Sequence, residues 1–147
     1  MKTFQANILA LIAAALLILL FGYTAISKIL EYNKFVFQLK LAQIPMIATL
    51  APLLGILLPV LELFIAWMLY KDSLRIKGFY ASFLLLFTFE IYITIMLLSG
   101  EKLPCTCGGI ISQMGWKTHL FFNAVFMIIS ILPIIYKPKP RIFTSAL

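Results

Sequence analysis

Four long apolar runs, separated by short polar segments, dominate the pattern of hydrophobic and polar positions along the chain. The runs cover residues 8–26, 46–70, 78–99 and 118–136. Each is long enough to cross the roughly 30 Å hydrocarbon core of a bilayer as an α-helix. Because lipid offers no partners to backbone N–H and C=O groups, apolar runs of this length favour helices. We therefore predict an all-α bundle of four transmembrane helices, with residues 1–147 forming a single transmembrane domain.

Two further features modify this simple pattern. Pro52 and Pro59 interrupt the first half of the second run, which predicts a kink or a short re-entrant segment before the span. Between the first two runs, residues 27–44 carry apolar side chains at roughly helical spacing, at Leu30, Phe37, Leu41 and Ile44. This spacing is typical of a short helix lying at the membrane interface. A lid over a cavity between the helices is an alternative interpretation of the same segment.

The composition agrees with a membrane protein and excludes several other classes. Hydrophobic residues make up 63% of the chain and charged residues 12%, whereas a soluble domain is about half apolar and about a quarter charged. A self-contained soluble enzyme, a disordered tail and a disulfide-stapled secreted module are therefore excluded. The net charge of +7 does not indicate nucleic-acid binding, because the basic residues lie between or beyond the apolar runs. The lipid bilayer is the partner that this composition implies.

The basic residues instead indicate how the chain is oriented. Helices that alternate in direction place seven of them on the side of the two termini: Lys2, Lys71, Arg75, Lys77, Lys137, Lys139 and Arg141. Five lie on the opposite side: Lys28, Lys34, Lys40, Lys102 and Lys117. Because the side richer in Lys and Arg usually faces the cytoplasm, both termini are predicted to be cytoplasmic. In a bacterial inner membrane, the loops after the first and third runs would then face the periplasm.

The only two cysteines of the chain, Cys105 and Cys107, lie in the loop after the third run. A disulfide between residues so close together closes a small ring that meets ordinary disulfide geometry only with strain. Strain makes a disulfide easier to reduce, which is typical of exchanging rather than structural bridges. Zinc would require about four ligands, and the chain offers two Cys and one His, so no metal site is expected. Lipidated or incidental cysteines are the alternatives to a redox-active pair.

Two carboxylates, Glu62 and Glu90, fall well inside the second and third runs. A carboxylate at that depth is costly unless it is protonated, paired or facing a cavity. Because the two helices run antiparallel with a short connection, Glu62 and Glu90 are candidates for one shared proton or quinone site near mid-membrane. The alternative is a neutral Glu that forms a hydrogen bond with Tyr92, Thr88 or a carbonyl group freed at a kink.

His119, the only histidine, lies at the start of the fourth run, twelve residues after Cys107. A histidine at this place can accept or donate a proton while Cys105 or Cys107 exchanges, which makes it a candidate catalytic residue beside the two cysteines. An interfacial histidine bonded to a loop carbonyl is the alternative interpretation. Asn123, one turn deeper on the same face, would support either role.

Three short motifs resemble those of known membrane proteins. The segment Gly22-Tyr-Thr-Ala-Ile-Ser-Lys28 resembles the SGxxK feature that closes the first span of DoxX-like proteins. The segment Leu58-Pro-Val-Leu-Glu62 resembles the P-x-x-E motif of their second span. The segment Pro104-Cys-Thr-Cys-Gly-Gly109 is similar to the CxCxG loop of the branch named for methylamine-utilisation protein E, MauE.

This resemblance carries expectations about fold and function. It implies a four-helix inner-membrane protein associated with thiol–disulfide exchange, often working beside a periplasmic thioredoxin-like protein. It assigns the redox role to Cys105 and Cys107. Lys28 and Glu62 match positions of the family that have no settled chemistry.

Hypotheses from different functional classes follow. The first is a membrane thiol–disulfide redox protein, in which Cys105 and Cys107 exchange electrons with a periplasmic thioredoxin-like partner and with a quinone in the bundle. The second is a non-catalytic membrane subunit or assembly factor that anchors a larger complex, because small residues such as Ala13 permit close helix contacts. A small transporter with a binding site around Glu62 and Glu90 is a third alternative.

Overall fold

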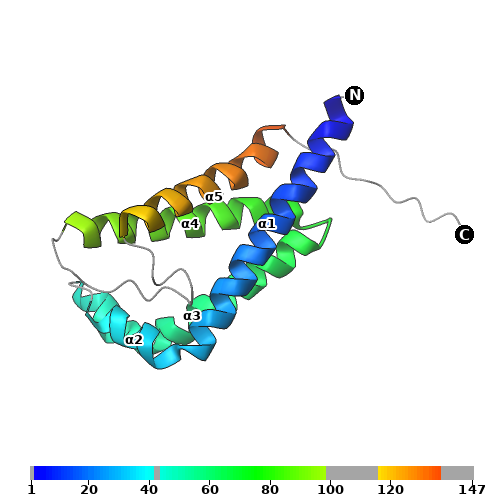
Figure 1. The fold of residues 1–147 in the computed structure, drawn as a ribbon. Coiled ribbons are helices and arrows are strands. Elements are labelled where there is room, and N and C mark those ends of the chain that lie inside the picture. Colours follow the sequence, from blue (N-terminus) through cyan, green and yellow to red (C-terminus); the bar gives the residue numbers. More distant parts are fainter. Residues whose placement is uncertain (1, 42–43, 99–115, 137–147) are drawn as a thin grey trace, which may run out of the picture.

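The computed structural model describes residues 2–41, 44–98 and 116–136, which form five helices and no strand (Figure 1). In chain order these are α1 (Lys2–Leu30), α2 (Tyr32–Lys40), α3 (Pro45–Tyr70), α4 (Arg75–Leu98) and α5 (Trp116–Tyr136). Four of them, α1, α3, α4 and α5, are long and apolar enough to cross a membrane. The prediction of an all-helical fold with four spans is therefore confirmed. Cys105 and Cys107 lie outside the described residues.

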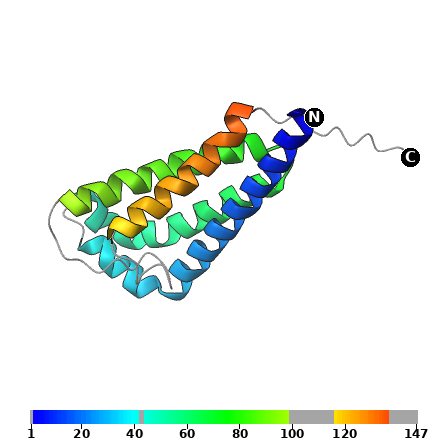
Figure 2. The same cartoon turned by 45° about the horizontal axis from the view of Figure 1, so that its top comes forward.

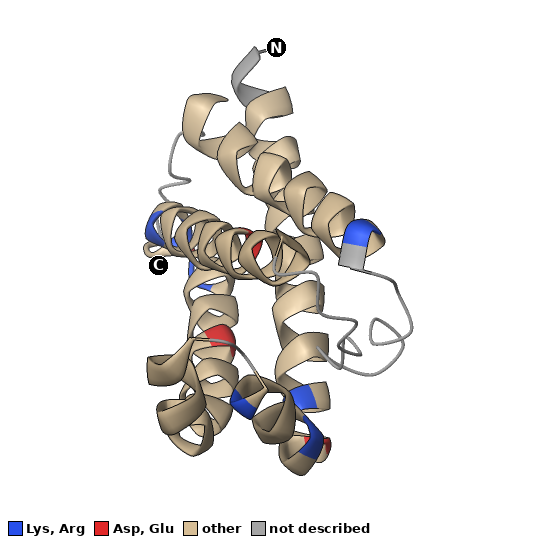
Figure 3. Ribbon diagram, turned by 90° about the vertical axis from the view of Figure 1, so that its left-hand side faces the viewer, with Lys and Arg blue, Asp and Glu red and all other residues tan. Residues whose placement is uncertain are grey.

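The long helices pack as two antiparallel pairs, α1 against α3 and α4 against α5 (Figures 1 and 2). The start of α1 and the end of α5 lie at the same end of the bundle (Figure 2). At this end, the small side chains of Ala10, Ala13 and Ala14 are buried and let α1 approach its neighbours closely. Lys and Arg lie mainly toward the ends of the helices, as the span assignment requires (Figure 3).

The first span is longer than the sequence predicts. Helix α1 continues past Ile26 to Leu30, so Ser27 and Lys28 belong to the bundle and not to an interfacial segment. The physical reason is that Lys28 is paired inside the bundle (below), so its charge does not require the helix to end at the membrane surface. The short helix predicted within residues 27–44 is correspondingly shorter and corresponds to α2.

Helix α2 lies against the first half of α3. Phe35, Val36 and Leu39 are buried on the face of α2 that packs there. The Tyr32 hydroxyl donates a hydrogen bond to the Pro52 carbonyl at 3.2 Å. Gly55 makes this close approach possible, because a Cβ at that position would lie 2.6 Å from Val36 Cγ2.

Helix α3 runs through both of its prolines without interruption. Pro45 occupies its first turn, where the missing N–H removes no helical hydrogen bond. Pro52 and Pro59 lie inside the same helix. The prediction of a separate re-entrant segment is therefore wrong, and residues 46–70 belong to one continuous span. The reason is that the packing of α3 against α1, α2 and α4 holds the helix together where the prolines remove backbone donors.

Candidate functional site

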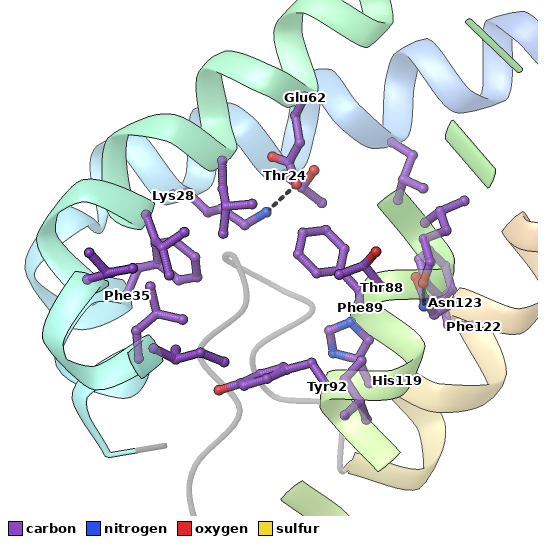
Figure 4. Close-up of a pocket in the computed structure, with 18 of the residues that line it drawn as sticks. Thr24, Lys28, Phe35, Glu62, Thr88, Phe89, Tyr92, His119, Phe122 and Asn123 are labelled. Atoms are coloured by element: carbon purple, nitrogen blue, oxygen red, sulfur yellow. Dashed lines mark hydrogen bonds and ion pairs between the residues drawn. The ribbon is translucent and has the colours of Figure 1, made fainter. Parts of the chain in front are cut away.

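A cavity of about 310 Å³ lies between two walls of the bundle (Figure 4). One wall comes from α1, α2 and α3 as far as Glu62, and the other from α4 between Leu86 and Ile93 and from the start of α5. Most lining side chains are aliphatic or aromatic. The volume is at the lower end of the range of small-molecule sites, about 300 to 1,000 Å³, which suits a ligand about the size of one substituted ring.

The polar end of this cavity is a buried ion pair between α1 and α3. Lys28 Nζ lies 2.7 Å from Glu62 Oε1. Lys28 is 4% exposed and Glu62 is 1% exposed, so water screens the pair very little. Removing two charges from water is costly, and a pair of this kind persists only when both partners are present. The two residues therefore stabilise each other inside the bundle.

Aromatic rings surround the ammonium group of Lys28. Its Nζ lies 5.7 Å from the ring centroid of Phe35 on α2 and also 5.7 Å from that of Phe89 on α4. Both distances are within the range of cation–π attraction. The two rings reach Lys28 from opposite walls of the cavity (Figure 4). The charge is thus held in place by contributions from α1, α2, α3 and α4.

The second oxygen of Glu62 provides the clearest sign of a binding site. Among the described residues, Glu62 Oε2 has no hydrogen-bond partner although it is fully buried. Thr24 lies beside it (Figure 4); in this arrangement the Thr24 hydroxyl donates to the Phe21 carbonyl at 3.3 Å, although it is also within reach of the Glu62 carboxylate. Both Lys28 and Glu62 line the cavity. The site therefore combines an ammonium group with an acceptor oxygen that the described part of the protein does not satisfy.

Glu90 occupies a different position from Glu62. Its Oε2 accepts a hydrogen bond from Asn123 Nδ2 at 2.8 Å. The same nitrogen donates to the Leu86 carbonyl at 2.9 Å, so Asn123 ties α5 to α4. Glu62 and Asn123 line the cavity, whereas Glu90 does not. Of the two carboxylates that the sequence suggests for one site, only Glu62 reaches this cavity.

His119 lines the cavity from α5 and lies close to Tyr92 of α4 (Figure 4). Both side chains belong to the wall opposite Lys28. Since Cys105 and Cys107 fall outside the described residues, the role of His119 in their exchange stays a prediction. Within the described residues, no group of three or more His, Cys, Asp or Glu side chains is placed to hold a metal ion.

Sequence reasoning missed three features of this site. It did not pair Lys28 with Glu62, although both appeared in the motifs that resemble DoxX-like proteins. It did not predict that the rings of Phe35 and Phe89 contact Lys28. The hydrophobic pattern within one segment does not show which other helix a side chain will face. It named Asn123 only as a support for His119 and did not predict the hydrogen bond from Asn123 to Glu90.

Comparison with known proteins agrees with the helical architecture. Residues 6–136 match the sequence model of the family described as methylamine utilisation protein MauE. No curated protein and no solved structure matches the chain. The family match covers all four long helices and the cavity between them.

Proposed function

The chain belongs to the methylamine utilisation protein MauE family of multi-pass membrane proteins, and from this premise we propose that it is an inner-membrane thiol–disulfide redox protein. Cys105 and Cys107 exchange electrons with a periplasmic thioredoxin-like protein. A quinone in the bundle accepts or supplies the same electrons from the membrane side.

The position of the cavity carries this proposal. Ile93 of α4 and His119 of α5 line the cavity. At 1.5 Å per residue, they lie about 8 Å and about 5 Å from the ends of α4 and α5 that flank residues 99–115. The segment with both cysteines is thus attached at the cavity end of the bundle. This arrangement supports electron transfer between a thiol pair and a ligand held in the cavity.

The ion pair also strengthens the expected orientation. Lys28 was one of five basic residues on the side opposite the termini. Lys28 is buried inside the bundle and does not belong to a segment that joins two spans, so four other basic residues remain on that side, against seven on the side of the termini. A larger excess favours cytoplasmic termini and a periplasmic position for the segment with Cys105 and Cys107.

The proposed exchange needs only three reactants, which are the partner, the cysteine pair and a quinone. A thiolate of the partner attacks the Cys105–Cys107 disulfide, and the mixed disulfide is resolved by the second thiol of the partner. The partner is oxidised and the cysteine pair becomes a dithiol. When that dithiol closes again to a disulfide, it releases two electrons and two protons, the number that converts one quinone into one quinol. In this proposal His119, which lines the cavity, accepts one of these protons.

The test is the double variant Cys105→Ser, Cys107→Ser expressed at the wild-type level. We expect the dithiol form of the thioredoxin-like partner to accumulate, as measured by alkylation and gel shift. A variant of the partner that keeps only its attacking cysteine should trap a mixed disulfide with the wild-type chain, and this species should disappear on reduction. If the double variant supports normal oxidation of every exported partner, the redox proposal fails. Co-purification of a stoichiometric membrane complex from that variant would then favour the non-catalytic subunit.

A further inference from the structure

The polar end of the cavity selects for a neutral ligand. Lys28 and Glu62 neutralise each other at 2.7 Å, so the site carries no net charge that would attract an anion or a cation. A charged head group would add an unpaired charge to a buried environment, at high cost. The walls around the pair are almost entirely apolar. A neutral, membrane-soluble molecule with a small polar head is the class that fits.

The pair also specifies which polar groups that head must carry. Lys28 has three N–H donors, and within the described residues its one hydrogen bond goes to Glu62 Oε1. It can therefore donate to an oxygen of the ligand. Glu62 Oε2 can only accept, and it has no partner among the described residues. A head that offers an acceptor and a hydroxyl donor would satisfy both groups.

We propose that the Lys28–Glu62 end of the cavity binds the head ring of a membrane quinol and discriminates against the corresponding quinone. This inference rests on the redox function proposed above and identifies its membrane ligand and its preferred form. A quinol hydroxyl donates to Glu62 Oε2. A quinone presents a carbonyl there, which leaves two acceptors facing each other and the buried oxygen unsatisfied.

The remaining walls fit a flat ring with a hydrocarbon tail. Phe35 and Phe89 stand on opposite sides of the polar end and provide aromatic surfaces for the ring (Figure 4). Met46 and Leu50 line the cavity and are also 70% and 42% exposed, so the cavity is not closed where they lie. A tail that passes between such residues reaches the lipid directly. The cavity itself then has to hold only the ring.

Preference for the quinol sets the direction in which the site assists electron transfer. A site that binds the reduced form more tightly makes reduction of its ligand more favourable by the ratio of the two affinities. The two electrons and two protons released by Cys105 and Cys107 would therefore pass more readily toward the membrane than away from it. The protein would thus oxidise the periplasmic partner and reduce the quinone in the membrane.

The test is equilibrium binding of ubiquinol-1 and ubiquinone-1 to the full chain in lipid nanodiscs, by calorimetry under anaerobic conditions. Because a hydrogen bond to a buried charged group is at stake, we expect ubiquinol-1 to bind about ten to a hundred times more tightly. In Glu62→Gln the amide can donate to a carbonyl, so the preference should disappear or reverse. The matched control is Glu90→Gln, which changes a carboxylate that does not line the cavity. This variant should keep the wild-type ratio of ubiquinol-1 to ubiquinone-1 affinity.

A second variant distinguishes loss of ligand binding from loss of folding. In Lys28→Met, Glu62→Leu both charges are removed together, which buried pairs usually tolerate. It should elute as the wild type does and bind both ligands at least about tenfold more weakly than the wild type binds ubiquinol-1. Equal affinity of the wild type for ubiquinol-1 and ubiquinone-1 would overturn the inference. So would unchanged binding to the double variant, or equally tight binding of decylbenzene, which has no oxygen.

The two proposals fail separately. The variant Cys105→Ser, Cys107→Ser should keep the ubiquinol-1 preference, because the binding site contains neither cysteine. If this preference holds while that variant still oxidises its partners normally, the redox function is wrong and the quinol site stands. If the wild type shows no preference while the cysteine variant blocks oxidation, only the quinol site is wrong.

Discussion

The end of the bundle that holds the start of α1 and the end of α5 is tightly packed, whereas the opposite end encloses a cavity with a buried ion pair. Alanines and large apolar side chains fill the packed end: Ala10, Ala13, Ala14, Leu17, Phe21, Ile65, Leu69 and Phe79. At the cavity end, Lys28 and Glu62 face about 310 Å³ of space. Burying two charges beside open space lowers the stability of the fold, which indicates that this region has a function.

The largest effect in this comparison should come from breaking the ion pair. We expect Lys28→Met alone to lower the free energy of unfolding by about 3–5 kcal/mol, because it leaves the Glu62 carboxylate buried without its partner. Adding Glu62→Leu should restore most of that loss. Thermal unfolding in detergent measures both variants. Equal stability of the single and double variants would show that the two charges do not depend on each other.

Added volume should distinguish the packed end from the cavity end. Ala13→Leu inserts three carbons where the side chain is 3% exposed, and we expect it to cost about 1–3 kcal/mol by overpacking. Leu54→Phe also adds three carbons, beside the cavity, where there is room, and should cost less than about 1 kcal/mol. The same unfolding measurement compares them. If Leu54→Phe is the more destabilising of the two, the cavity is not open space.

The smallest effect should come from the carboxylate that does not face the cavity. In Glu90→Gln the side-chain oxygen can still accept the hydrogen bond from Asn123. We therefore expect a change in unfolding free energy below about 1 kcal/mol. Glu62→Gln removes one partner of the ion pair and should cost several times more. A larger loss in Glu90→Gln than in Glu62→Gln would reverse the roles of the two carboxylates.

The sequence predicted the spans well because membrane helices are marked by length and hydropathy alone. The limits of 46–70 agree with α3 to within one residue. The end of α1 was misplaced because Lys28 and Ser27 look like residues at a membrane surface. Only the pairing of Lys28 with a residue 34 positions later shows why the helix continues.

The site was predictable in part, for a related reason. Glu62 and Glu90 stand out because any carboxylate in an apolar run needs an explanation. Which of them faces a cavity depends on the rotation of α3 and α4 about their axes, and in helices this apolar the hydrophobic pattern is nearly uniform around the axis. The partners Lys28 and Asn123 became visible only once the register between neighbouring helices was known.

The most direct test of the redox account is the state of Cys105 and Cys107 in intact cells. A membrane-impermeant maleimide is added before and after mild reductant, and labelling is read by gel shift. We predict no labelling before reduction and labelling of both cysteines afterwards, because the pair is an outward-facing disulfide. Free thiols under both conditions, or labelling only after the membrane is broken, would contradict the account.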